Sequence, residues 1–400
     1  MDFGVYVHVP FCRRRCPYCT FYTVERPAAA APMQRFLAAV AQEWQQRVVP
    51  RLERGDRART LYVGGGTPSD LPAAALRGFL RRLAATLPGG LRALDEVTVE
   101  CNPESATPEL LDGLRAVGVD RISLGVQALD GRDLGRLGRP AGPKEVRAAL
   151  AAVASRFATW NVDLILGVPG SDAARLVAAL EELHRRGAPH LSFYCLELPA
   201  ARARLLGDPQ REDPDAFKAG LYELAASWVE AHGYEHYEIS NAARPGHRAR
   251  HNSAYWDGRE YVGLGPGAHS FAAGVRSANR SGLERYVLAL QAGAAPESTS
   301  ERLTPGMRWR EEVLLGLRRR DGIDVVALRL DGQRGLIDRL SRGGLAWFDQ
   351  GRLGLTVRGW MISDSIVLQL VAAGCGTQPG LTSPGSLGTF ERLAVTGPEC

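Results

Sequence analysis

The stretch HVPFCRRRCPYCTFYT, residues 8–23, places Cys12, Cys16 and Cys19 on one short loop with the spacing C-x3-C-x2-C. A structural zinc site closes with four nitrogen or sulfur ligands, and an ordinary iron–sulfur cluster is also held by four thiolates. The position two residues after Cys19, where a fourth cysteine could stand, is Phe21. Either the fourth ligand comes from elsewhere in the chain, or one metal position is open.

Six strand-like segments alternate with helix-like segments over the first half of the chain, beginning with the strand that leads into the cysteine loop. The expected strands are residues 4–9, 60–66, 95–103, 120–127, 161–170 and 190–198, and helical spacing marks residues 72–87, 107–117, 143–157 and 171–187. Because the strands read as near-continuously apolar, they predict an α/β fold with a parallel sheet covered by helices. Right-handed crossovers would curl six such units into a partial (β/α)6 barrel of the TIM type, with an open two-sided Rossmann sheet as the competing topology.

Polar or glycine residues stand at or near the carboxyl end of every expected strand. Besides the cysteines, they are Gly64, Gly65, Gly66 and Thr67 after the second strand, Glu100 and Asn102 at the third, Gln127 at the fourth, Asp163 in the fifth and Glu197 at the sixth. Burying a carboxylate or an amide in an apolar strand costs several kcal/mol unless the group is paired. One such residue is typical of a satisfied core group, but six at one rim of an α/β barrel predict a functional site.

The composition is that of an ordinary soluble protein, with 45% hydrophobic and 23% charged residues. The formal net charge of +5 is spread along the chain, and nearly all of the positive charge is arginine in helix-like segments, which argues against a nucleic-acid partner. Seven cysteines, with three in one loop, do not form a disulfide framework, so we expect a reducing compartment. The first residues show no secretory signal and no stretch is long enough to span a membrane, so we expect a cytoplasmic protein.

The second half changes character after residue 200, where a polar, proline-containing stretch predicts a linker. A helix is expected at 216–233, followed by the strand-like YEHYEIS and the glycine- and aromatic-rich HNSAYWDGREYVGLGPGAHSF. From Thr304 the sequence predicts a helix, a hairpin and a final helix, which make an α+β winged-helix-like domain that packs as a lid. The expected divisions are a core barrel (1–215), a connecting region (216–300), the C-terminal domain (301–372) and a disordered tail (373–400).

Three features together resemble the radical S-adenosylmethionine (SAM) superfamily: the C-x3-C-x2-C loop after the first strand, GGGTPS at 64–69 after the second, and the series of βα units. The alternative is a zinc knuckle completed by a residue such as His8, and the glycine stretch decides against it. The resemblance implies that Cys12, Cys16 and Cys19 hold a [4Fe–4S] cluster whose fourth iron is chelated by SAM. It further implies that reduction of the cluster cleaves SAM to a 5′-deoxyadenosyl radical. Consecutive glycines fit this assignment because they let the backbone approach the cofactor.

The resemblance extends over about residues 4–371 to the branch that contains the coproporphyrinogen dehydrogenases and the HemW-type haem chaperones. Its segments here are YVHVPFC, TVECNP, SLGVQ, LGRP and NVDLILGVPG, and RLGLTVRGWMISDSIV resembles the C-terminal domain of that branch. By this resemblance the predicted SAM-binding residues are Tyr6, Tyr18, Gly65, Gly66, Thr67, Glu100, Gln127, Arg139 and Asp163. The carboxylates among them are chemically suited to accept hydrogen bonds from ribose hydroxyls and an ammonium group.

Two functions of different kinds stay open under this resemblance: oxygen-independent oxidative decarboxylation of coproporphyrinogen III, or binding of haem and its transfer to acceptor proteins. The dehydrogenases usually continue the loop as C-x-C, whereas this chain has Cys19-Thr20-Phe21, the C-x-F form of the chaperones. It also begins almost directly at the first strand, without the N-terminal extension of the dehydrogenases. Both departures favour the chaperone. A radical SAM enzyme with another substrate is a distant third reading.

HNSAYW at 251–256 resembles the H-N-x-x-Y-W motif of the haem chaperones. It nominates His251, Asn252, Tyr255 and Trp256 for haem, with His269 as the fallback iron ligand. The residues alone favour a structural turn, in which His251 and Asn252 cap backbone groups and the two aromatics pack against the barrel. The expected partners are haem, haem-accepting proteins and a small electron donor such as a flavodoxin or ferredoxin. A nucleic acid is not expected, and a dimer is left open.

Overall fold

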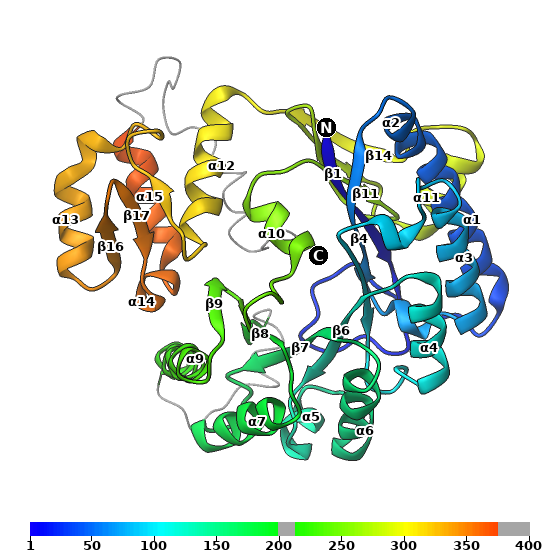
Figure 1. The fold of residues 1–400 in the computed structure, drawn as a ribbon, viewed down its shortest axis with the longest axis horizontal. Helices are drawn as coiled ribbons and strands as arrows, with labels where there is room; N and C mark the ends of the chain where they lie inside the picture. The colour runs from blue at the N-terminus through cyan, green and yellow to red at the C-terminus, as the bar shows by residue number, and fades with distance from the viewer. Residues whose placement is uncertain (199–212, 375–400) are drawn as a thin grey trace.

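The six expected strands of the core are present and lie side by side in the order of the sequence (Figure 1). The computed structural model describes residues 1–198 and 213–374. The core strands are β1 (Asp2–Val9), β4 (Arg57–Gly65), β5 (Glu96–Cys101), β6 (Arg121–Gln127), β7 (Thr159–Leu166) and β8 (His190–Cys195). Each pairs in parallel with the next, which confirms the predicted parallel βα core.

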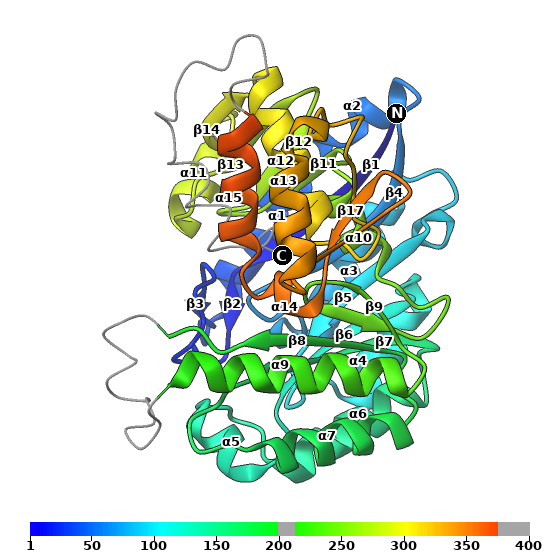
Figure 2. The same cartoon turned by 90° about the vertical axis from the view of Figure 1, so that its left-hand side faces the viewer.

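Helices cover one face of this sheet (Figure 1). They are α1 (Ala30–Arg47), α2 (Val49–Glu53), α3 (Ala73–Ala84), α4 (Pro108–Val117), α5 (Gly131–Arg136), α6 (Pro143–Ala154), α7 (Ala173–Arg185) and α9 (Pro214–Ala231), the last running along β8 (Figure 2). Helix α4 shows how local sequence sets the bounds. The Thr107 hydroxyl accepts a hydrogen bond from the Leu110 amide before the first turn, and Gly118 ends the helix in the left-handed conformation (φ 108°).

The opposite face of the core sheet is polar, because apolar and polar residues alternate along the strands. On β5, Val97 and Val99 belong to the hydrophobic core, whereas Glu96, Thr98 and Glu100 occupy the alternate positions and point to the other face. The strands β6, β7 and β8 follow the same alternation. The expectation of near-continuously apolar strands is therefore wrong in one respect: helices cover only the outer face, and the inner face lines the barrel.

Residues after 213 add strands to both edges of the core sheet. Strand β11 (Tyr261–Leu264) pairs in parallel with β1, and the antiparallel strands β12 (His269–Ala272), β13 (Val275–Asn279) and β14 (Glu297–Arg302) continue from it. At the other edge, β10 (Asn241–Ala243) and β9 (Glu235–Glu238) follow β8. The result is a 12-stranded mixed sheet whose edges, among the described residues, are β9 and β14, so the barrel is partial.

Two helices of this part of the chain pack on opposite faces of the sheet. Helix α10 (Arg250–Trp256) lies on the inner face, between the sheet and the C-terminal domain (Figure 1). Helix α11 (Leu283–Gln291) packs beside α1 on the outer face. The segment that carries HNSAYW is therefore placed inside the barrel.

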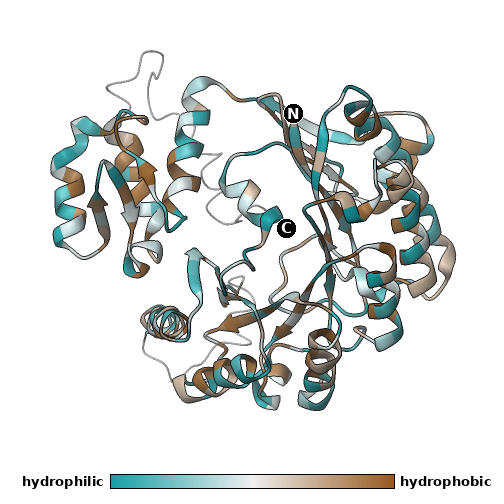
Figure 3. Cartoon of the chain, viewed as in Figure 1, coloured by the Kyte–Doolittle hydropathy of each residue, from teal (hydrophilic) through white to brown (hydrophobic). Residues whose placement is uncertain are grey.

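A second hydrophobic core holds the C-terminal domain together. Its elements are α12 (Pro305–Leu317), β15 (Ile323–Asp324), α13 (Arg334–Arg342), β16 (Ala346–Asp349), β17 (Arg352–Leu355), α14 (Val357–Trp360) and α15 (Ser363–Gly374). The predicted helix, hairpin and final helix are all present, and the Thr304 hydroxyl caps α12 by accepting a hydrogen bond from the Met307 amide. In Figure 3 the hydrophobic colour gathers on β16, β17 and α15.

The four expected divisions of the chain stay predictions. The boundary at 215 falls within α9 and the boundary at 300 falls within β14, which belongs to the main sheet. The predicted linker after residue 200 and the predicted tail, with Cys375 and Cys400, lie almost entirely outside the described residues. Within residues 1–198 and 213–374, no helix combines the length and the hydropathy needed to cross a membrane.

Candidate metal and cofactor site

The cysteine loop begins and ends on a pair of two-residue strands. Strands β2 (Phe11–Cys12) and β3 (Val24–Glu25) pair in parallel and close the loop (Figure 2). Within it, Cys16 is buried, Cys12 and Cys19 are half-buried, and the Cys19 amide donates a 3.1 Å hydrogen bond to the Cys16 carbonyl. Two other described cysteines lie elsewhere: Cys101 is in the hydrophobic core on β5, and Cys195 is exposed at the end of β8.

A chain of hydrogen bonds joins two of these cysteines across the barrel rim. The Thr67 hydroxyl lies 3.4 Å from Cys12 Sγ and accepts a 2.9 Å hydrogen bond from Asn102 Nδ2. Arg139 donates from Nη2 to Asn102 Oδ1 at 2.8 Å, and its Nη1 lies 3.6 Å from Cys16 Sγ. We call these three residues the Thr67–Asn102–Arg139 relay. It orients both thiols from the ends of neighbouring strands, as the outer partners of metal ligands do.

Asn102 is absent from the set predicted to bind SAM, although its position at the end of the third strand drew attention to it. Thr67 and Arg139 are predicted contacts to SAM, and the structure places both beside cysteine thiols. Their contact with SAM stays a prediction. The amide chemistry of Asn102 could have indicated the relay. An amide carries both a donor and an acceptor, so it can join a hydroxyl to a guanidinium.

The zinc alternative required a fourth ligand such as His8. His8 is buried, its Nε2 lies 2.9 Å from the Tyr22 carbonyl and its Nδ1 lies 3.0 Å from the Tyr6 hydroxyl, so both ring nitrogens are already engaged. Within the described residues, no three His, Cys, Asp or Glu side chains converge tightly enough to hold one metal ion as placed. Ligands of a single zinc ion must converge, whereas each thiolate of a cluster binds its own iron, so this result does not count against the cysteine loop.

Two glycines after β4 bring the backbone against the cysteine strand. Gly65 has φ 104°, and a Cβ there would lie 2.5 Å from the His8 ring. A Cβ on Gly66 would lie 2.7 Å from the Phe11 carbonyl oxygen, and the Gly66 amide donates to the Val9 carbonyl at 2.7 Å. A side chain at Gly66 would push the two strand ends apart, and one at Gly65 would displace the His8 ring, so the glycines keep a narrow backbone surface beside the cysteines.

Two half-buried carboxylates, Glu100 and Asp163, line the inner face near the same rim. Glu100 accepts hydrogen bonds from the Tyr62 hydroxyl at 2.7 Å and from the Gly65 amide at 2.9 Å, and Asp163 accepts one from Asn161 Nδ2 at 2.7 Å. Burial raises the pKa of Glu100 to about 7 and the pKa of Asp163 to about 6. A carboxylate whose charged form is disfavoured by burial is stabilised by a ligand that brings an ammonium group or hydroxyl donors.

The other residues predicted to bind SAM flank this rim. Tyr6 is buried on the inner face and packs beside Tyr62, with ring centroids 6.1 Å apart. Tyr18 packs against a small apolar cluster, and burial raises the pKa of its hydroxyl. Gln127, at the end of β6, has φ 69°, a left-handed conformation that costs a non-glycine residue about 1–3 kcal/mol and is typical of functional sites. Glu197 is exposed and lies two residues beyond the carboxyl end of β8, so its part in the rim stays a prediction.

These residues fit a [4Fe–4S] cluster with SAM at its open iron. Three thiols lie on one loop, two half-buried carboxylates can accept hydrogen bonds from ammonium and ribose groups, and a glycine backbone lies beside them. The Nε of Arg139 is buried and has no hydrogen-bond partner among the described residues, which leaves a donor for a carboxylate. When bound, such a cluster would supply single electrons to a ligand at its open iron.

Replacing Arg139 by glutamine should cost about 10–100-fold in cluster affinity, since the partners that orient metal ligands typically contribute that much. The variant loses the donor near Cys16 and leaves the Asn102 carbonyl oxygen unpaired. Iron retained per chain during anaerobic dialysis measures the effect, and the midpoint potential of the retained cluster separates it from a general loss of stability. Arg156→Gln is the matched control, because Arg156 pairs with Asp112 on the outer surface. Equal iron retention in both variants would contradict the relay.

The predicted haem residues lie on α10, inside the barrel. His251 is 1% exposed, and its Nδ1 lies 2.7 Å from the Thr60 hydroxyl while its Nε2 lies 2.8 Å from the Tyr255 hydroxyl. The ring stacks on Tyr62 at 5.2 Å, and burial lowers the pKa of His251 to about 3. Tyr255 and Trp256 are also buried. This arrangement matches the structural interpretation of HNSAYW, in which the motif packs against the barrel and does not bind a ligand.

Helix α10 sits at the level of the strand beginnings and not at the cysteine rim. Glu96, at the start of β5, accepts hydrogen bonds from the amides of Arg250 (2.8 Å) and His251 (3.1 Å). Thr60 precedes Gly64 by four residues on β4, which places His251 roughly 13 Å below the rim. The structure therefore does not bring His251 together with the cysteines.

The loop after β11 reaches the rim instead. Because β11 runs parallel to β1, its carboxyl end lies beside the cysteine strand, and a Cβ on Gly265 would lie 2.4 Å from the His8 carbonyl oxygen. His269, half-buried at the start of β12, belongs to this loop. The buried Glu43 on α1 secures it by accepting hydrogen bonds from the Gly265 amide and from Asn279. Sequence reasoning missed Glu43, since nothing local distinguishes it from other helix glutamates.

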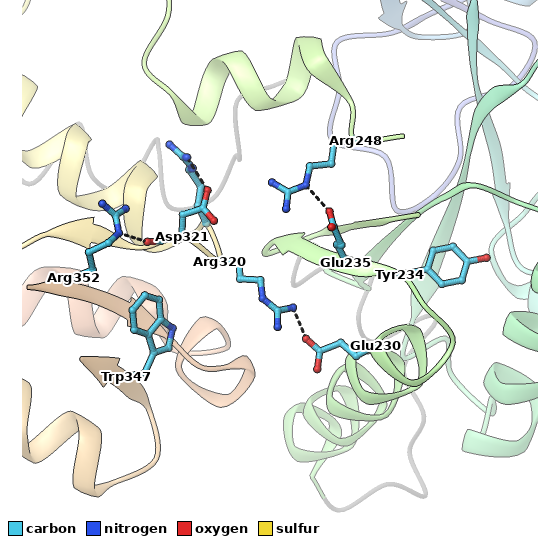
Figure 4. A pocket seen from close by; sticks show the side chains of 9 residues that line it. Glu230, Tyr234, Glu235, Arg248, Arg320, Asp321, Trp347 and Arg352 are labelled. Atoms are coloured by element: carbon cyan, nitrogen blue, oxygen red, sulfur yellow. Dashed lines mark hydrogen bonds and ion pairs between the residues drawn. The ribbon is translucent and has the colours of Figure 1, made fainter. Parts of the chain in front are cut away.

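A separate polar cleft of about 990 Å³ lies between α9, β9 and the C-terminal domain (Figure 4). None of the predicted site residues lines it. Its arginines are largely neutralised: Arg320 pairs with Glu230 at 2.6 Å and Arg248 pairs with Glu235 at 3.0 Å. The Arg320–Glu230 pair joins the C-terminal domain to α9 across this cleft.

Comparison with known proteins agrees with this geometry. Residues 6–183 match the family model of the radical SAM superfamily. The chain is 36% identical over 379 residues to the haem chaperone HemW of Mycobacterium tuberculosis, covering 92% of this chain and 95% of that protein. The chain belongs to the HemW family. HemW of Lactococcus lactis is 31% identical over 380 residues, covering 91% of this chain and 96% of that protein.

A solved structure shares the architecture of this HemW family member. Coproporphyrinogen III oxidase (HemN) from Escherichia coli, a radical SAM enzyme, superposes with a TM-score of 0.79 and covers 93% of this chain and 90% of its own. The two sequences are only 22% identical, so this likeness shows the fold alone. The radical SAM fold predicted from the sequence is thereby confirmed.

Proposed function

We propose that this protein is a haem chaperone, which binds haem and passes it to acceptor proteins while Cys12, Cys16 and Cys19 hold a [4Fe–4S] cluster. The observation that carries the proposal is the near full-length likeness to proteins named haem chaperone HemW. The C-x-F form of the cysteine loop, with Phe21 in place of a further cysteine, supports it. In this proposal the carboxylates of Glu100 and Asp163, together with Gly65, Gly66, Tyr6, Tyr18 and Gln127, surround SAM.

Two of the relay residues, Thr67 and Arg139, have two roles in this proposal: they contact the cysteines and also SAM. Thr67 and Arg139 would orient the cysteine thiolates, and Arg139 Nε, which has no partner among the described residues, would supply a hydrogen-bond donor for the carboxylate of SAM. The predicted partners, a small electron donor and haem-accepting proteins, and the predicted cytoplasmic location are part of the same proposal. An oxygen-sensitive cluster and unpaired cysteines suit a reducing compartment.

Haem binding is proposed at the rim, with His269 ahead of His251 as the iron ligand. His251 is 1% exposed inside the barrel, so a flat macrocycle could reach its ring only if α10 moved away, whereas His269 is half-buried. Asn252, Tyr255 and Trp256 then support the barrel wall from α10 and do not touch the macrocycle. His269 lies in the loop beside the cysteine strand, where a flat ligand can approach from solvent.

The two histidines predict different outcomes in haem titration. His269→Ala should weaken binding by about tenfold or more and shift the Soret band, because an axial ligand is lost. His251→Ala should keep the Soret band but lower the free energy of unfolding by about 1–3 kcal/mol, because it removes one hydrogen-bond partner from each of the buried residues Thr60 and Tyr255. If only the His251 variant showed a changed Soret band, the iron ligand would be His251 on α10 and not His269.

The alternative function, oxidative decarboxylation of coproporphyrinogen III, is expected to be absent. The fold shared with HemN keeps this alternative in view, but fold alone does not determine function. The reconstituted protein, incubated anaerobically with coproporphyrinogen III, SAM and dithionite, should yield no protoporphyrinogen IX by chromatography. Formation of protoporphyrinogen IX over many turnovers would favour the decarboxylase function over the haem-chaperone function.

A further inference from the structure

The loop between the first two cluster cysteines consists of three consecutive arginines whose side chains are all exposed. Arg13 is tied to the loop beneath it: its amide donates to Asp70 Oδ2 at 2.8 Å and its guanidinium lies 3.6 Å from Asp70 Oδ1. Arg15 donates only to the Cys19 carbonyl, at 3.4 Å, and Arg14 has no ion-pair partner among the described residues. The charges of Arg14 and Arg15 are therefore not neutralised by a carboxylate of the described chain.

An exposed aromatic side chain stands on the same loop. Phe21 is 38% exposed, whereas most large hydrophobic side chains of the chain are buried. Arginine and aromatic residues are the types enriched at protein interfaces, and exposed apolar surface beside uncompensated charge marks such a site. The surface formed by Arg14, Arg15 and Phe21, here called the loop surface, therefore has the composition of a docking site.

We propose that the loop surface docks an acidic electron-carrier protein that reduces the cluster. Uncompensated positive charge attracts a partner with negative surface charge and speeds its encounter, and transient electron-transfer interfaces are small, less than about 1,200 Å². One electron leaves the partner's reduced cofactor and enters the cluster, so the partner is oxidised by one and the cluster is reduced by one. No bond forms or breaks. The proposal rests on the cluster part of the proposed function and is independent of haem.

Position supports this assignment as well as charge. The arginines lie between Cys12 and Cys16, and Phe21 lies two residues after Cys19, so a protein bound to the loop surface contacts the segment that carries all three ligands. Exposed arginines without a carboxylate partner in the described chain also occur on α3, at Arg81 and Arg82, so charge alone does not distinguish the loop surface. What distinguishes it is the combination of that charge with an exposed Phe21 on the segment that carries the three cysteines.

The test compares two double variants with the same change in charge. Arg14→Glu/Arg15→Glu alters the loop surface, and Arg81→Glu/Arg82→Glu alters two exposed arginines on α3. The anaerobically reconstituted proteins are mixed with reduced flavodoxin at low salt, and cluster reduction is followed by the loss of visible absorption. The loop variant should be reduced about tenfold or more slowly than wild type, and the α3 variant within about twofold. Reduction by dithionite, which needs no docking, should proceed alike in all three.

Binding of oxidised flavodoxin, measured by calorimetry, gives a readout that does not depend on electron transfer. Its affinity should fall in the loop variant alone and should weaken with salt only where the arginines are present. Equal flavodoxin affinities and rates in the two variants would overturn the proposal. So would an unchanged rate combined with weaker haem binding in the loop variant, which would assign the surface to the cargo. Neither result would affect the haem titration of the unaltered protein, so the two proposals fail separately.

Discussion

Replacing Cys12, Cys16 or Cys19 by alanine should leave the anaerobically reconstituted protein nearly colourless. The ~400 nm absorption of the cluster and its iron, about four per chain, should fall to the level of the apoprotein in each variant. The physical reason is that each thiolate binds its own iron, so two thiolates on this loop cannot hold the cluster against loss to solvent. Absorption spectra and iron analysis of the same samples measure the effect.

Two other cysteines provide the matched controls. Cys195 is exposed at the end of β8, and Cys101 is 2% exposed within the hydrophobic core, so neither is placed on the cysteine loop. Cys195→Ala should therefore retain full iron, and Cys101→Ala should retain it with a small loss of stability. Zinc in stoichiometric amounts without iron in the wild type would contradict the cluster.

The change Gly66→Ala should destabilise the protein by about 3 kcal/mol and abolish SAM binding. The added Cβ would meet the carbonyl oxygens of Phe11 and Val9 at 2.7 and 2.8 Å, and these backbone atoms are fixed by hydrogen bonds from Thr67 and Gly66. Relief requires the cysteine strand to move away from β4, which disturbs the thiols and the proposed cofactor surface together. Denaturant unfolding and equilibrium dialysis with SAM measure the two effects.

Gly78→Ala is the control for this substitution. Gly78 lies within α3, and a Cβ there would meet nothing within 4 Å. Alanine should raise the free energy of unfolding by about 0.5–1 kcal/mol, because it restricts the unfolded chain and favours the helix. If both glycine variants were equally stable and bound SAM alike, the close approach at Gly66 would have no functional role.

Local patterns in the sequence were sufficient for the core strands and the cysteine loop. The spacing of Cys12, Cys16 and Cys19, the glycines after β4 and the periodicity of α4 each lie within a few residues, where residue type directly limits conformation. The same holds for the C-terminal hairpin, which pairs residues close in the chain.

Long-range pairing could not be predicted in the same way. β11 pairs with β1 although Tyr261 and Gly4 are far apart in sequence, and this pairing carries the His269 loop to the rim. Arg139 lies three residues after α5 and contacts Cys16, which is 123 positions earlier in the chain, and nothing near Arg139 in the sequence indicates that contact. The continuous polar inner face could not be predicted, because it forms only when the alternate residues of several strands come together on one side of the sheet.

The central claim, that this protein passes haem on to other proteins, is tested most directly by the kinetics of transfer. The haem-loaded protein is mixed anaerobically with increasing concentrations of the apoprotein of a b-type cytochrome, and the Soret band is followed by stopped flow. Transfer within a complex of the two proteins predicts a rate that rises with acceptor concentration, because complex formation is bimolecular. A rate that is independent of acceptor and equal to that found with a general haem scavenger would mean simple release of haem, and would contradict the account.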